Sequence, residues 1–110
     1  MRLSTVMLLA ALGAAPSYAS AQSVNADDGK RLFDHRCGMC HSAIGMGTGL
    51  LARRVGPGEA ELEKRGNLAA PFVVAVARNG MGNMPAITRG DVSDAELAKI
   101  AAYLAKGPAQ

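Results

Sequence analysis

The sequence predicts an all-α fold built as one small domain. Apolar side chains recur at the spacing of a helix face in three stretches, at about residues 27–40, 71–79 and 93–106. Helix-ending glycines and an N-terminal capping pattern punctuate these stretches. No β-rich run precedes Cys37, the first of the two cysteines. We therefore expect three to five helices.

The first 21 residues have the pattern of a cleaved secretory signal peptide. Met1 and Arg2 precede a short apolar core at residues 6–12, and residues 19–21 form an A-x-A cleavage site. The apolar run is too short to favour a membrane span of about 20 residues. We expect residues 1–21 to be removed, no integral membrane span to remain, and the protein to reach the periplasm. An uncleaved membrane anchor is the alternative.

The first helix is expected to run from Asp27 through Cys40. Asn25 or Asp27 is a suitable N-cap, and acidic residues in the first turn suit the helix dipole. Gly29 and Phe33 share the apolar stripe of this helix. Because glycine is unfavourable within a helix, we expect another helix to approach closely at Gly29.

This helix ends in Cys37-Gly38-Met39-Cys40-His41, the C-x-x-C-H pattern that attaches a c-type haem. Two thiols on one helical turn can form thioethers with the two vinyl groups of one porphyrin, and the adjacent imidazole can bind the iron. We therefore predict one covalent haem c, with Cys37 and Cys40 as its thioethers and His41 as an axial iron ligand.

The cysteine pair has three other possible interpretations. A thioredoxin-like motif would need a strand before the cysteines. A zinc site would need two further ligands, and only His35 and His41 are available besides the thiols. A disulfide would close a very small loop and would stabilise the fold little.

The composition of the domain favours a haem. Removal of residues 1–21 from the 110-residue chain leaves residues 22–110, a domain of 89 residues. A chain of this length builds a marginal core and usually needs a further stabilising element. It has no Trp, and its only aromatic residues are Phe33, Phe72 and Tyr103. A covalently held porphyrin would supply the large apolar body that these side chains do not.

Glycine dominates the segment after the motif. Three glycines within residues 45–49 predict an irregular loop that lies close to a flat ligand. Gly56-Pro57-Gly58 then interrupts the chain, and residues 59–65 predict a short polar helical turn.

Two further helices are expected in the second half. The first begins at Pro71, which favours an initial helical position, and ends at Asn79-Gly80. Its predicted apolar face carries Phe72, Val73, Val76 and Ala77. A capping box at residues 93–96 opens the last helix, which runs through Lys106. Residues 81–86 between them are not periodic.

The charges exclude one class of partner. The chain has 12 Lys and Arg against 9 Asp and Glu, and the loss of Arg2 lowers the net charge from +3 to +2. No dense basic run exists, so we expect no nucleic-acid partner. The pairs Arg53-Arg54 and Lys64-Arg65 are either solvated surface, or neutralise haem propionates or steer a redox partner.

The order of elements over residues 27–106 resembles class I cytochrome c. Gly29, Phe33 and Tyr103 match the residues at which the first and last helices of that family cross, and Met84-Pro85-Ala86 matches its sixth-ligand loop. The resemblance implies a small class I cytochrome c fold wrapped around one covalently attached haem. Residues 78–86 also resemble the cytochrome subunit of p-cresol methylhydroxylase-type flavocytochromes.

Met84 is the predicted second axial ligand. Of the four methionines outside the signal peptide, Met39 lies inside the attachment motif and Met46 follows His41 by only five residues, so neither is expected to reach the opposite face of the porphyrin. Met81 and Met84 remain. Pro85 holds Met84 in an extended backbone conformation that can aim its side chain inward, and Met81 is then a packing contact.

The chain departs from the family after the haem histidine. The family often has Gly-Pro-x-Leu there, and the proline carbonyl accepts a hydrogen bond from the imidazole. This chain has Gly47-Thr48-Gly49-Leu50. The carbonyl of Thr48 is the candidate acceptor for His41, but no proline fixes its backbone.

These features predict an electron-transfer protein and not an enzyme. Its haem iron would shuttle single electrons between a periplasmic dehydrogenase or flavoprotein and a terminal acceptor. The alternative is a haem enzyme, or a gas- or peroxide-reactive haem protein with a labile sixth ligand. A third hypothesis, compatible with the first, is a cytochrome subunit tightly bound to a dehydrogenase.

Overall fold

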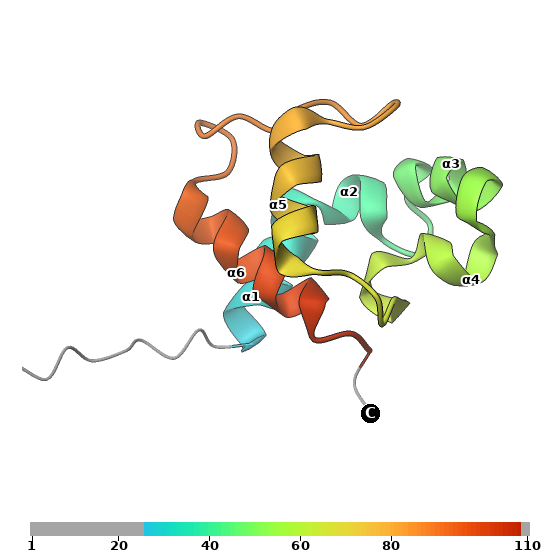
Figure 1. Ribbon diagram of the computed structural model, residues 1–110, viewed down its shortest axis with the longest axis horizontal. Helices are drawn as coiled ribbons and strands as arrows, with labels where there is room; N and C mark the ends of the chain where they lie inside the picture. Colours follow the sequence, from blue (N-terminus) through green and yellow to red (C-terminus); the bar gives the residue numbers. More distant parts are fainter. Residues whose placement is uncertain (1–25, 109–110) are drawn as a thin grey trace, which may run out of the picture.

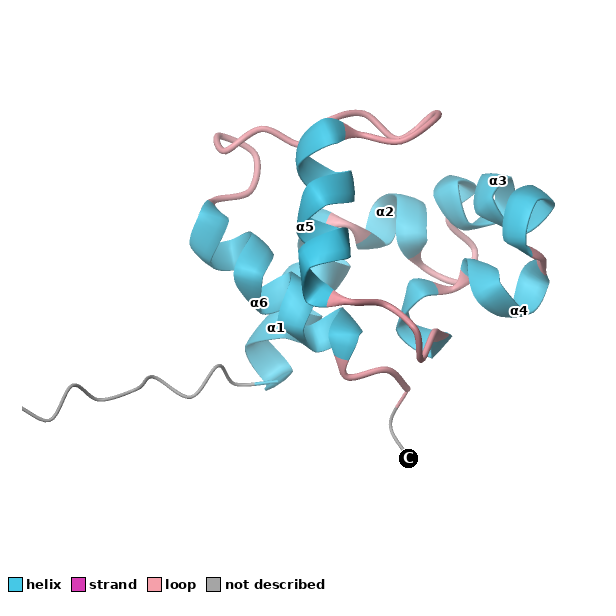
Figure 2. Ribbon diagram, in the orientation of Figure 1, coloured by secondary structure: helices cyan, strands magenta, loops and turns pink. Residues whose placement is uncertain are grey.

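The computed structural model describes residues 26–108, which form helices without a strand among them (Figure 2). The elements are α1 (Ala26–Arg36), α2 (Gly38–His41), α3 (Met46–Val55), α4 (Pro57–Ala60), the 3-10 turn η1 (Leu62–Lys64), α5 (Ala70–Asn79) and α6 (Asp94–Ala105). The all-α prediction is confirmed. The predicted signal peptide, residues 1–21, and the candidate cap Asn25 lie outside the described residues.

The helices α1 and α6 pack across one another at Gly29 (Figure 1). A Cβ atom at this position would lie 2.6 Å from Cβ of Tyr103 and 2.7 Å from the carbonyl oxygen of Lys99. One turn further along α1, the ring of Phe33 lies 6.1 Å from that of Tyr103, tilted by 48°. The predicted close approach at Gly29 is confirmed.

The hydrophobic core brings together α1, α5 and α6. Its buried members are Leu32, Phe33, Leu68, Ala77, Val92, Leu97, Ile100 and Leu104. Val73 and Val74 pack against it from α5, whereas Phe72 is 49% exposed. The prediction that Phe72 belongs to the apolar face is therefore wrong. Each residue advances about 100° around a helix, so the face that buries Val73, Val74 and Ala77 turns Phe72 outward.

The predicted helix from Asp27 through Cys40 is interrupted. The helix α1 ends at Arg36, and Cys37 has φ −120° and ψ −25°, outside regular helical geometry. Its backbone N–H still donates to the carbonyl of Phe33 at 2.8 Å. At the other end α1 begins at Ala26, so Asp27 lies inside the helix and is not its cap.

The predicted glycine-rich loop is instead the start of a helix. The helix α3 contains two of the three glycines, and Gly45 precedes it. A Cβ at Gly47 would lie 2.8 Å from the carbonyl oxygen of Cys40, and a Cβ at Gly45 would lie closer still. These glycines allow a close backbone approach and do not supply a positive φ. The break at residues 56–58 is confirmed, with φ 89° at Gly56, and the polar turn that follows forms α4 and η1.

The ends of the last two helices match their predictions. Pro71 lies in the first turn of α5, and Gly80 follows that helix with φ 75°. At the start of α6, the Oγ of Ser93 accepts a hydrogen bond from the backbone N–H of Glu96 at 3.2 Å. The Ser93 N–H in return donates to the Glu96 carboxylate at 2.8 Å. Both halves of the capping box are thus present.

Candidate functional site

Cys37, Cys40 and His41 lie on one helical turn. The carbonyl oxygen of Cys37 accepts hydrogen bonds from the backbone N–H groups of Cys40, at 3.1 Å, and of His41, at 2.9 Å. The two thiols are not bonded to each other. Cys37 is half-buried against the hydrophobic core, and Cys40 is exposed. The turn therefore presents two thiols and an imidazole from five consecutive residues.

Burial sets the protonation of this turn. It raises the pKa of the Cys37 thiol to about 11, with a smaller contribution from the neighbouring Cys40. It also lowers the pKa of His41, because a charged imidazole loses hydration there. His41 is therefore neutral at pH 7, the form in which an imidazole binds a metal.

The Nδ1 atom of His41 is buried and has no hydrogen-bond partner in the described part of the chain. The predicted bond from His41 to the carbonyl of Thr48 is not formed. Thr48 instead lies buried in α3, and its hydroxyl donates to the carbonyl of Ser42 at 2.8 Å. This bond ties α3 to the residue that follows His41, so Thr48 acts on the neighbouring backbone and not on the imidazole.

Met84 packs against the same hydrophobic core as Cys37, although the two residues are far apart in the sequence. The other three methionines of residues 26–108 point to solvent. Their exposed fractions are 91% for Met39, 73% for Met46 and 55% for Met81. The structure thus separates Met84 from Met81, the closest competitor for the role of axial ligand.

The segment that carries Met84 is a tight hairpin, residues 81–84. Met81 and Met84 exchange two backbone hydrogen bonds of 3.0 Å, and φ is positive at Gly80 and Gly82. A Cβ at Gly82 would lie 2.9 Å from the guanidinium of Arg54, so the hairpin contacts the last turn of α3. Figure 1 shows this loop leaving α5 and extending toward α3.

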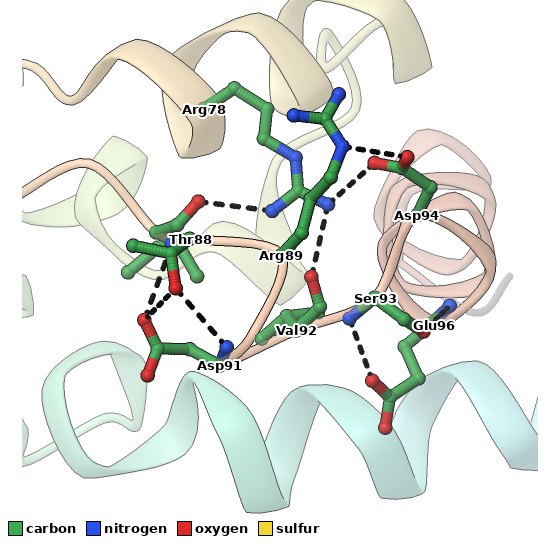
Figure 3. Close-up of polar contacts among 9 residues, drawn as sticks. Arg78, Thr88, Arg89, Asp91, Val92, Ser93, Asp94 and Glu96 are labelled. Atoms are coloured by element: carbon green, nitrogen blue, oxygen red, sulfur yellow. Dashed lines mark hydrogen bonds and ion pairs between the residues drawn. The ribbon is translucent and has the colours of Figure 1, made fainter.

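Arg78 organises the chain that follows the hairpin (Figure 3). Its guanidinium donates to the carbonyl of Ile87 at 3.0 Å, to the carbonyl of Val92 at 3.0 Å, and to the carboxylate of Asp94 at 2.7 Å. No role for Arg78 was evident from the sequence. A basic residue in the last turn of a helix was visible, but partners 9 to 16 residues away were not.

The donor set fits a haem c. Two thiols on one turn can form the thioethers, and a neutral imidazole and a thioether are the axial pair of electron-transfer c-type cytochromes. Within residues 26–108, no group of three or more His, Cys, Asp and Glu side chains gathers as a candidate metal site. In the same range, no helix is long and apolar enough to cross a membrane.

A family model matches residues 24–104 of the chain. It is described as "Cytochrome C oxidase, cbb3-type, subunit III". The match covers almost all of the residues that the structure describes, including the attachment turn and the Met84 hairpin.

Two curated relatives are similar over most of the chain. The cytochrome c subunit of 4-cresol dehydrogenase (hydroxylating) from Pseudomonas putida is 35% identical over 82 residues, which are 74% of this chain and 61% of that subunit. Cytochrome c6 from Nostoc sp. (strain PCC 7120) is 32% identical over 85 residues, which are 77% of this chain and 70% of that protein. The match thus spans about three fifths of the first relative. No solved structure gives a significant match.

Proposed function

Because this chain belongs to the cytochrome c family described as cbb3-type cytochrome C oxidase subunit III, and its cofactor is a covalent haem c, we propose that it is a periplasmic carrier of single electrons. In this proposal Cys37 and Cys40 hold the haem, and His41 and Met84 bind its iron. One observation carries it. Cys37 of the attachment turn and Met84 pack against one hydrophobic core, while the other methionines of residues 26–108 are exposed.

The bound haem supplies one-electron chemistry at its iron. The chain sets the conditions for it. Burial keeps His41 neutral, and the thioether of Met84 is a soft, neutral ligand that favours the ferrous state. If His41 and Met84 both bind the iron, no position would be left on it for a substrate. This supports an electron carrier over the gas- or peroxide-reactive alternative.

The electron donor we propose is a periplasmic dehydrogenase or flavoprotein, in keeping with the relative that is a subunit of 4-cresol dehydrogenase. The surface near the attachment turn supports a protein partner. Met39, Ile44 and Met46 are 91%, 98% and 73% exposed, and exposed apolar groups of this kind favour protein contacts. Arg53 and Arg54 on α3 are also exposed, and such charges act mainly on the association rate.

The test of this function is Met84→Ala. Loss of the thioether is expected to remove the sulfur-to-iron charge-transfer band of the ferric protein and to lower the reduction potential. It should also raise the affinity for cyanide at least about tenfold, a change of about 1.4 kcal/mol. Absorption spectroscopy, potentiometry and a cyanide titration measure the three effects.

Met81→Ala is the matched control, because it removes the same side chain from the other end of the hairpin. It should leave the band and the cyanide affinity unchanged. Two results would contradict the proposal: an unchanged spectrum in Met84→Ala, or ready binding of carbon monoxide by the wild-type ferrous protein.

A further inference from the structure

We propose that Arg78 is a positioning residue that holds Met84 on the iron by fixing the return of its loop. The loop in question is residues 80–93, between α5 and α6. This inference rests on the proposed axial role of Met84. It assigns the strength of that ligation to a side chain that need not touch the haem.

Two hydrogen bonds of the Arg78 side chain go to backbone carbonyls of the loop. One nitrogen of its guanidinium, Nη1, donates to the carbonyl of Ile87, and Nη2 donates to the carbonyl of Val92. The side chain is only 14% exposed, so water competes little for these bonds. The planar guanidinium is preorganised to serve several acceptors in fixed directions.

Arg78 lies next to the point at which the two ends of the Met84 hairpin segment meet. The chain leaves α5 at Gly80, and the backbone N–H of Ile87 returns to the carbonyl of Ala77 at 2.7 Å. The Arg78 bond to the carbonyl of Ile87 secures the same residue through its other backbone group. The backbone on both sides of the Met84 hairpin is thus hydrogen-bonded to the last turn of α5.

The rest of the loop is ordered by its own contacts. The hydroxyl of Thr88 donates to the carboxylate of Asp91 at 2.7 Å, and the backbone N–H of Val92 donates to the carbonyl of Thr88 at 3.1 Å. The capping box then joins the loop to α6. Residues 88–93 therefore form a compact turn, and Arg78 connects this turn to α5.

Arg89 provides a matched control. It bonds the same carboxylate, Asp94, at 2.8 Å, but its side chain is 72% exposed. Within the described residues it donates to no loop carbonyl, as Figure 3 shows for the cluster drawn. Its removal deletes an arginine and an Asp94 contact while the loop stays attached to α5.

The experiment compares holoprotein variants Arg78→Ala and Arg89→Ala. Cyanide binds a ferric haem of this type after the thioether leaves, so its binding rate reports loop opening. We expect the rate to rise about tenfold in Arg78→Ala, which corresponds to about 1.4 kcal/mol, and to stay within about twofold in Arg89→Ala. On heating, the Arg78→Ala charge-transfer band should be lost before the far-ultraviolet helix signal.

A conservative variant keeps the test valid if Arg78→Ala yields no holoprotein. Lysine retains the charge beside Asp94, but a single ammonium cannot reproduce the fixed fork of the guanidinium. Arg78→Lys should therefore bind cyanide at a rate between the wild-type and Arg78→Ala rates. If Arg78→Ala cannot be made, a wild-type rate in Arg78→Lys overturns the inference.

Two further outcomes would overturn it with Arg78→Ala in hand. One is a wild-type cyanide rate. The other is simultaneous loss of the band and the helix signal on heating, which would mean a structural role alone. Met84→Ala, measured in parallel, separates this inference from the proposed function. If Met84→Ala loses the band while Arg78→Ala behaves as wild type, only the positioning role fails. If the Met84→Ala spectrum is unchanged, the axial assignment itself fails.

Discussion

At the scale of single residues, the glycines of residues 26–108 serve two different purposes, close contact and backbone conformation. Gly29 lies in the first turn of α1, where its lack of a side chain lets α6 approach. Gly47 does the same for α3 against the backbone of Cys40. The same residue type at Gly80 and Gly82 instead provides the positive φ that the Met84 hairpin requires.

Gly29→Ala is expected to lower the free energy of unfolding by about 1–3 kcal/mol, the usual cost of overpacking a tight interface. The added methyl would overlap Cβ of Tyr103 and the carbonyl oxygen of Lys99, and a backbone atom cannot rotate away. Denaturant unfolding of the holoprotein, followed by circular dichroism, measures the change.

Gly58→Ala is the control for the Gly29 variant. Gly58 lies in α4, and a Cβ atom there would meet nothing within 4 Å. Its stability should stay the same or rise by up to about 1 kcal/mol, because alanine restricts the unfolded chain. Equal losses in both variants would show that helical glycine itself, and not the helix crossing, decides the effect.

At the scale of helices, the capping box explains why α6 begins where it does. Ser93 and Glu96 satisfy each other's backbone N–H groups, and Glu96 also bonds the guanidinium of Arg36 from α1 at 3.0 Å. The start of α6 is therefore fixed both by its own sequence and by a contact with the first helix.

Ser93→Ala should reduce the free energy of unfolding by about 1 kcal/mol, the typical value of a lost N-cap. The backbone N–H of Glu96 would then have no side-chain acceptor. Ser93→Asp keeps an acceptor at the same position and should retain most of the stability. Thermal unfolding of the two variants measures the difference, and an alanine variant as stable as the aspartate variant would contradict it.

The signals that are local in sequence predicted these helices well. The ends of α5 and α6 follow from Pro71, Gly80 and the capping box, each of which acts within a few residues. The attachment turn could be predicted for the same reason. The sequence did not reveal that the helix α3 forms where a loop was predicted. Gly45 and Gly47 are needed there because they lie against the Cys40 backbone, and this tertiary contact leaves no signal in the local sequence.

The candidate site likewise combines features that the local sequence predicts with features that only tertiary contacts determine. A non-periodic loop was expected around Met84, yet nothing local indicated that it forms a hairpin or that Arg78 would secure it. The hydrogen bond predicted from His41 to the carbonyl of Thr48 is not formed, and Thr48 instead contacts the backbone of Ser42 through its hydroxyl. Both features depend on contacts between elements, which the periodicity of the sequence does not predict.

At the scale of the whole molecule, carboxylates join the elements. Asp28 pairs with Lys99, Glu96 with Arg36, and Asp94 with Arg89 and Arg78. The hydrogen bond from Lys99 is the main cause that lowers the pKa of Asp28, and that from Arg89 does the same for Asp94. For Glu96 the backbone N–H of Ser93 contributes most, followed by Arg36, and its pKa falls to about 2.

Stability should therefore decrease in acid. A carboxyl group whose pKa is lower in the folded state binds fewer protons there than in the unfolded state. Its contribution is present above its ordinary pKa and is lost as the pH falls through the folded pKa. For Glu96 this window extends from about 4.5 down to about 2. The denaturation midpoint should begin to decrease below about pH 6.5, because the lowered pKa of His41 acts in the same direction, and should decrease more steeply below about 4.5.

Glu96→Gln is the variant that checks the assignment. It cannot titrate, so the loss of stability between pH 4.5 and 2 should be shallower than in the wild type. Chemical denaturation at a series of pH values measures both slopes. A wild-type midpoint that does not change between pH 5 and 3 would contradict the role of these carboxylates.

The crossing of α1 with α6 also bears on how the chain reaches this structure. The two helices join the beginning and the end of the domain, and the Lys99–Asp28 contact spans 71 residues. Closing a loop of that length costs about 1.7 kcal/mol more conformational entropy than closing one of ten residues. This crossing is accordingly a late contact, since α1 packs mainly against α6, the last helix of the described residues. Until the two helices meet, the core against which Cys37 packs is incomplete, so the half-burial of the Cys37 thiol depends on the closing of the chain.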